Sequence, residues 1–147
     1  MTTRLVDAAA RPWCGVAFPG MTAVELAPIL NVSDWDASAA WFAKLGFRIG
    51  FTWPEDSDSP TGFGSVLWGD VRIFVCVDAQ GGRGEHGVWI SIFVDDVDAV
   101  YARCQREGLE VTREPVDEVW GVREFHVRHP DGHVFRIGTG NEEDDEE

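Results

Sequence analysis

The sequence contains an internal repeat, and this repeat constrains the fold more than any other feature. VSDWDASAAWFAKLGFRI begins at Val32, and VDDVDAVYARCQREGLEV begins at Val94, 62 positions later. Residues of the same type recur at this offset: Asp34 and Asp96, Asp36 and Asp98, Ala37 and Ala99, Gly46 and Gly108. A repeat of this length indicates two copies of one supersecondary unit.

Each copy shows the same predicted order of elements. Asp34 and Asp96 precede the helices as N-caps, and Gly46 and Gly108 follow them as helix stops. The expected strands are 23–32, 47–53, 62–68 and 71–77 in the first copy and 88–94, 109–113, 121–128 and 133–138 in the second. The order βαβββ, present twice, predicts an α+β fold in which two tandem modules form a curved sheet or cup.

These elements set the expected domain boundaries. The chain is divided into an N-terminal arm at 1–22, a first module at 23–80, a linker at 81–86, a second module at 87–140 and an acidic, disordered tail at 141–147. The tail is expected to be a solvated run of like charges.

Charge and composition narrow the classes of partner. The formal net charge of −14 at pH 7 repels nucleic acid and anionic membranes and attracts cationic ligands. No apolar run is long enough to span a membrane or to act as a secretion signal, so we expect a cytoplasmic protein. Cys14, Cys76 and Cys104 lack ligand-like spacing, and we expect Cys76 and Cys104 to be buried free thiols.

Strand alternation predicts which side chains line the concave face. Ile90, Ile92 and Val94 are uniformly aliphatic and are expected to face the helix, which turns Trp89, Ser91 and Phe93 into the concavity. An offset of about 61 aligns Phe74 with Phe135 on the last strands. The other expected concave positions are Ala27, Ile29 and Asn31 on the first strand and Val75 and Arg136 on the last strands.

The paired segments NVSDWDASAAWFAKLGF and FVDDVDAVYARCQREG resemble the glyoxalase/bleomycin-resistance/dioxygenase superfamily, also called the vicinal oxygen chelate fold, over about residues 24–139. In its enzymes, His on the first strands and Glu on the last strands hold a divalent metal. The resemblance places Ala27, Val75, Trp89 and Arg136 at those positions, and none of these side chains can ligate a metal. We therefore expect no metal and no other cofactor.

An enzyme with a relocated metal is the alternative. His126 and His133 lie on neighbouring strands of one predicted hairpin, and Glu124 is near them in sequence. These three residues would be the nearest ligands in a lyase, isomerase or dioxygenase of this superfamily.

One branch of the superfamily resembles this chain further. Trp120-Gly121 precedes the penultimate strand, and the last strand carries FRI with Arg136. Both features resemble bleomycin-resistance proteins, which are small, acidic and metal-free. Those proteins are dimers that hold a cationic glycopeptide antibiotic in clefts at the interface. The resemblance implies a homodimer that sequesters a bleomycin-like small molecule and does not modify it.

The residue types suit such a ligand, which has a flat aromatic tail and a positive charge. Aromatic faces stack on planar rings and attract cations, each contributing roughly 0.5–2 kcal/mol. Glu55 and Asp56, in the loop TWPEDSDSPTG, add negative potential. The expected ligand-binding residues are Asn31, Phe51, Glu55, Asp56, Phe63, Trp89, Ser91, Phe93, Trp120 and Arg136.

Three alternatives stay open at this stage. Trp89 and Phe93 would also suit a dimer core without a ligand, since interfaces and pockets both favour aromatic residues. EDSDS would also suit an ordinary solvated loop. Independently of that loop, the ligand could be an unknown metabolite instead of an antibiotic. Arg136, if buried, needs a carboxylate from a neighbouring strand.

Overall fold

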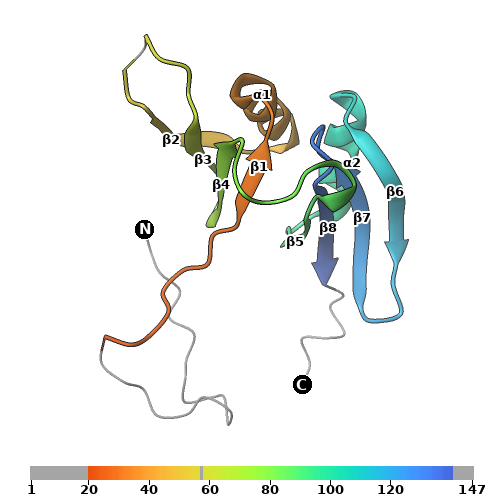
Figure 1. The fold of residues 1–147 in the computed structure, drawn as a ribbon. Helices are drawn as coiled ribbons and strands as arrows, with labels where there is room; N and C mark the ends of the chain where they lie inside the picture. The colour runs from red at the N-terminus through yellow and green to blue at the C-terminus, as the bar shows by residue number, and fades with distance from the viewer. Residues whose placement is uncertain (1–19, 57, 141–147) are drawn as a thin grey trace.

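The computed structural model describes residues 20–56 and 58–140 and contains two four-stranded sheets, each with one helix (Figure 1). The first module consists of β1 (Ile29–Val32), α1 (Trp35–Leu45), β2 (Arg48–Trp53), β3 (Phe63–Trp68) and β4 (Val71–Val77). The second consists of β5 (Trp89–Phe93), α2 (Val97–Arg106), β6 (Glu110–Asp117), β7 (Val122–Arg128) and β8 (Val134–Gly140). A short 3-10 helix, η2 (Gly84–His86), lies between them. The predicted α+β fold of two tandem βαβββ modules is confirmed.

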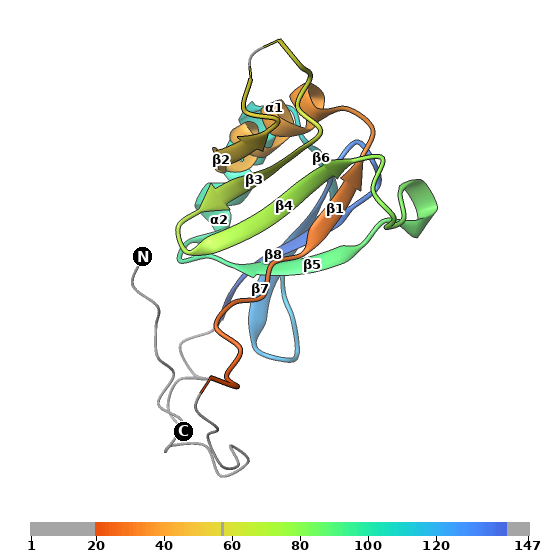
Figure 2. The ribbon, with the colours of Figure 1, turned by 60° about the vertical axis from the view of Figure 1, so that its left-hand side comes forward.

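Both sheets have the same topology. The strand orders are β1-β4-β3-β2 and β5-β8-β7-β6, with β1 parallel to β4 and β5 parallel to β8. The remaining pairs are antiparallel. β1 and β5 are therefore edge strands of two separate sheets, and Figure 2 shows them next to each other.

The helix boundaries follow from local residue chemistry. The side chains of Asp34 and Asp96 accept hydrogen bonds from the backbone N–H groups of Ala37 and Ala99, at 2.9 and 3.1 Å. These bonds satisfy donors that the first helical turn leaves without partners. Gly46, with a φ of 138°, ends α1 in a conformation that a side chain would disfavour.

One hydrophobic core serves both modules. α1 lies between the two sheets (Figure 1), and α1 also contacts α2. The rings of Trp41 and Phe42 on α1 reach Phe135 on β8, with centroids 5.5 and 5.7 Å apart. One face of each sheet therefore packs on this shared core, and we call the opposite face its outer face.

The register of the last strands corrects one sequence prediction. Ile29 pairs with Phe74, and Ser91 pairs with Arg136, so the repeat offset on these strands is 62 rather than 61. Val75 instead pairs with Leu30, and both are buried in the core. The prediction that Val75 is a concave position was wrong, and Phe74 is the counterpart of Arg136.

Two strand boundaries differ from the prediction by more than two residues. β1 begins at Ile29 instead of 23, directly after Pro28, which has no N–H to donate to a neighbouring strand. β6 continues to Asp117 instead of 113, with Pro115 tolerated in an edge strand whose register shifts near it. Cys76 is only half-buried, while Cys104 is buried as expected.

The proposed arm at 1–22 and tail at 141–147 fall almost entirely outside the described residues, since only 20–22 of them are described. None of the helices in the described part of the chain is long and apolar enough to cross a membrane.

Candidate functional site

The outer face of the first sheet carries a cluster of three phenylalanine rings. Phe51 on β2, Phe63 on β3 and Phe74 on β4 have ring centroids 5.5–6.0 Å apart. Phe51 is 42% exposed, Trp53 on the same strand is 63% exposed, and Ile29, which pairs with Phe74, is 57% exposed. The cluster is thus an apolar surface in which Phe51 is exposed and Phe63 and Phe74 are partly buried.

The outer face of the second sheet carries two large exposed rings of its own. Trp89 and Phe93 on β5 are 62% and 67% exposed, and Ser91 between them is also exposed. The three side chains alternate along one strand, so all three lie on the face away from the core. The prediction that they face away from the helix is confirmed.

A charged pair lies beside these rings. Nη2 of Arg136 on β8 donates to both carboxylate oxygens of Glu124 on β7, at 2.7 and 3.0 Å. The Glu124 side chain is only 6% exposed, so the guanidinium neutralises a nearly buried carboxylate. The neighbouring-strand carboxylate expected for Arg136 is therefore present.

His126 completes this face, and sequence reasoning considered it only as a metal ligand. It pairs with Arg136 across β7 and β8, and its ring meets Trp89 edge to face at 5.3 Å. Burial lowers the pKa of His126, although Glu124 opposes the shift. The alternation of β7 could have placed His126 on the outer face with Glu124 from the sequence.

A groove of about 560 Å³ runs along the seam between the two sheets. Trp89, Ser91 and Phe93 line one side of it, and Val71 and Arg72 of β4 line the other. The wall is mostly apolar, which suits an aromatic or aliphatic group better than a charged one.

The structure does not bring all of the predicted ligand residues together. Asn31 is buried, and its side chain accepts from the N–H of Ala79 and donates to the carbonyl of Gly81, so it positions the linker. Glu55 and Asp56 lie on the exposed β2–β3 loop, and Trp120 lies in the exposed β6–β7 turn.

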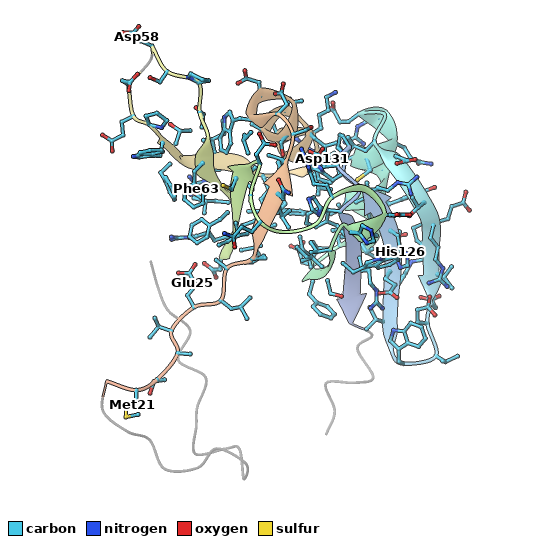
Figure 3. The ribbon with its side chains drawn as sticks, viewed as in Figure 1. Met21, Glu25, Asp58, Phe63, His126 and Asp131 are labelled. Carbon is cyan, nitrogen blue, oxygen red and sulfur yellow. The ribbon has the colours of Figure 1, made fainter. Side chains whose placement is uncertain are left out.

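The two outer faces of one chain carry residues on different sides of the molecule. Figure 3 shows Phe63 and His126 on opposite sides of the molecule, with Asp131 between the modules. The phenylalanine cluster and the Trp89 face belong to separate sheets, and both sheets contribute residues to the shared core.

The residues at the metal positions of the superfamily do not fit a metal. Ala27 and Phe74 offer no lone pair, Trp89 is a donor only, and Arg136 is permanently protonated. Across residues 20–56 and 58–140, no three His, Cys, Asp or Glu side chains are placed to hold a metal ion. The candidates for a relocated site do not converge: the His133 ring bonds to Asn31 on β1, whereas His126 lies on the outer face.

The sequence matches the family described as the Glyoxalase/Bleomycin resistance protein/Dioxygenase superfamily over residues 23–137. The chain belongs to this superfamily. The name covers enzymes as well as resistance proteins, so membership by itself does not distinguish catalysis from binding. A search of proteins with curated functions returned no match.

Three solved structures share the fold with this chain. TioX from Micromonospora sp. ML1 superposes with a TM-score of 0.68 at 20% identity, covering 79% of this chain and 98% of TioX. A bleomycin-binding protein complexed with bleomycin gives 0.64 at 22% identity, with coverage of 80% and 98%. A bleomycin resistance determinant encoded on the transposon Tn5 gives 0.65 at 24% identity, also with coverage of 80% and 98%.

Proposed function

We propose that this chain is a metal-free binding protein that captures a bulky, cationic aromatic small molecule of the bleomycin type and does not modify it. The observation that carries this proposal is the exposure of large rings on both outer faces, at Phe51, Trp53, Trp89 and Phe93. Large exposed apolar patches on a folded protein usually mark a surface that binds something.

In this proposal, two copies of the chain build the binding cleft. Phe63 of the phenylalanine cluster and His126 beside Trp89 lie on opposite sides of the molecule, which favours a cleft built from the first sheet of one copy and the second sheet of another. A two-fold axis would generate two identical clefts from these two surfaces. The chain would then act as a homodimer with one ligand site per subunit.

The charge distribution supports a cationic ligand. Arg136 is neutralised by Glu124, so the second sheet offers no free guanidinium at this position to an anion. The chain carries a net charge of −14, and Glu55 and Asp56 lie on an exposed loop that extends from the first sheet. A negative field of this size draws cations toward the protein.

Capture of a toxic small molecule would serve antibiotic resistance, and the cytoplasm is the compartment in which we expect it. Cys76 and Cys104 are both free thiols. Unpaired cysteines are usual in reducing compartments, where disulfides are rare. The fold that this chain shares with a bleomycin-binding protein complexed with bleomycin supports the proposal.

A complementation experiment tests the two-copy cleft. Phe51→Ala damages the first-sheet surface, and Trp89→Ala damages the second-sheet surface. Each variant is purified alone and as a mixed dimer selected through two different affinity tags, and bleomycin binding is measured by calorimetry. In a mixed dimer, one cleft carries both substitutions and the other carries neither, so one cleft of wild-type affinity should reappear per dimer.

Control dimers and the wild-type protein show whether the recovered binding comes from a cleft shared by two copies. A dimer of two differently tagged Trp89→Ala chains has no intact cleft and should bind weakly. A mixed dimer that binds as weakly as its parents would overturn the two-copy cleft. A wild-type protein that gives no binding signal at micromolar bleomycin would overturn the choice of ligand.

A further inference from the structure

The turn HPDGH, residues 129–133, joins the two modules through its two histidines. His129 Nε2 lies 2.8 Å from Ser38 Oγ on α1, and His133 Nε2 lies 2.8 Å from the carbonyl oxygen of Asn31 on β1. Both histidines are 1% exposed. Figure 3 shows Asp131, in the same turn, between the modules. We call these two intermodule contacts the histidine bridge.

The hydrogen-bond partners fix the protonation state of both rings. The backbone N–H of Asp131 donates to His129 Nδ1 at 2.9 Å, and that of Val88 donates to His133 Nδ1 at 3.2 Å. A backbone N–H can only donate, so Nδ1 of each ring carries no hydrogen. Each neutral ring therefore carries its hydrogen on Nε2, where it donates across the module boundary.

His133 links the two edge strands that border the seam. Its Nε2 donates to Asn31 in β1, while its Nδ1 accepts from Val88, which immediately precedes β5. β1 and β5 belong to separate sheets and do not pair with each other. The imidazole thus helps to set the spacing of the two sheets beside the groove that Trp89 lines.

The surroundings of His129 disfavour a positive charge. From α1 it meets the rings of Trp41 and Phe42, at centroid distances of 4.9 and 5.5 Å, and the hydroxyl of Ser38. The titratable groups facing it are His133, with ring centroids 5.5 Å apart, and the carboxylate of Asp131, 3.9 Å from Nδ1. Burial, followed by His133, lowers the pKa of His129 to about 4, with Asp131 opposing the shift.

We infer that the histidine bridge is a proton-sensitive contact whose protonation separates the two modules at the seam. A proton added to the His129 ring occupies Nδ1 and points at the backbone N–H of Asp131 that now donates to it. It also places a charge among aromatic rings and a second imidazole. Release of Ser38 and Asn31 from the bridge would free α1 and β1 to move relative to the second module. This inference does not depend on the proposed ligand.

Nuclear magnetic resonance of the unmodified protein tests the first step. At pH 7 the imidazole nitrogens of His129 and His133 should show unprotonated Nδ1 and protonated Nε2. On acidification, hydrogen exchange of the Val88 amide and of α1, corrected for its intrinsic pH dependence, should accelerate about tenfold or more with the same midpoint as the His129 resonances. An Nδ1-protonated ring at pH 7, or exchange that does not follow the imidazole titration, would overturn the inference.

Three variants test the second step. His129→Asn retains a side-chain acceptor for the Asp131 N–H but removes the titrating ring and the bond to Ser38. It should give faster exchange in α1 at pH 7 and lose the acid-dependent acceleration. Ser38→Ala should raise exchange at pH 7 and retain the acid response. His86→Gln, at an exposed histidine, should behave as the wild type. Equal acid responses in His129→Asn and the wild type would contradict the inference.

Discussion

Glu124 and Arg136 form a charged pair in which one nitrogen, Nη2, donates to both carboxylate oxygens at 2.7 and 3.0 Å. Arg136→Met leaves the nearly buried Glu124 carboxylate without this partner. We expect the free energy of unfolding to fall by about 3 kcal/mol, as for other broken buried pairs. Urea denaturation measures the change.

Another charged pair, which is exposed to solvent, provides the control for this prediction. Arg128 pairs with Glu110 at 2.7 Å, but both side chains are about half exposed. Arg128→Met should therefore cost less than about 1 kcal/mol. The double variant Glu124→Gln with Arg136→Met should recover most of the lost stability. An equal loss of unfolding free energy in Arg136→Met and Arg128→Met would show that the burial of Glu124 does not determine the loss.

His129 gives the protein a defined pH dependence of stability. The pKa of His129 is 6.5 in its ordinary state and about 4 in the folded protein. Between these values the unfolded chain binds more protons, so the free energy of unfolding falls as the pH is lowered from 6.5 to 4. The slope is about 1.4 kcal/mol per pH unit and the total about 3 kcal/mol, with the full contribution present above pH 6.5. Urea denaturation at a series of pH values measures it.

The same urea denaturations on two variants distinguish the contribution of His129 to the pH dependence from that of the acidic side chains. His129→Asn should lose this part of the slope, and His86→Gln should retain it. A His129→Asn protein whose stability falls as steeply as the wild type between pH 6.5 and 4 is incompatible with this assignment.

Phe74 should contribute to ligand binding. A repeat offset of 61, instead of the observed 62, pointed to Val75 for this position. Phe74→Ala opens the ring cluster with Phe51 and Phe63, and we expect bleomycin affinity to fall about tenfold, within the range of aromatic contacts. Val119, which is 98% exposed at the tip of the β6–β7 turn, supplies the control. Val119→Ala should leave the dissociation constant unchanged in the same titration.

Gly132 is required for the close approach of the HPDGH turn to the linker. Its φ is +92°, and a Cβ at this position would overlap the backbone of Gly84. Gly132→Ala should lower the free energy of unfolding by about 3 kcal/mol, from backbone strain and steric overlap together. Gly69→Ala also has a positive φ of +57° but meets nothing within 4 Å, so it should cost about 1 kcal/mol. Thermal or urea unfolding compares the two.

The repeat and the caps were sufficient to predict the fold from the sequence. Asp34 and Asp96 cap helices because their side chains act within three residues, so purely local chemistry identifies both. Strand alternation likewise placed Trp89, Ser91 and Phe93 on one face. It failed at Val75 because a one-residue error in offset moves a side chain to the opposite face of a strand.

The relation between the modules was not available from the sequence. The role of Asn31 depends on the linker at Ala79 and Gly81, and that of His133 depends on Asn31, which is 102 positions earlier. Local patterns carry no information on such contacts. For the same reason, the sequence could place the ring surfaces on each module but could not show how the two surfaces lie relative to each other.

Calorimetry with metal-free bleomycin on protein dialysed against a chelator tests capture without a metal most directly. We expect saturable binding of one bleomycin per chain, unchanged by adding zinc or manganese to the protein, and recovery of the ligand chemically intact. Binding that appears only after a divalent metal is restored, or a ligand recovered in altered form, would contradict capture by a metal-free cleft.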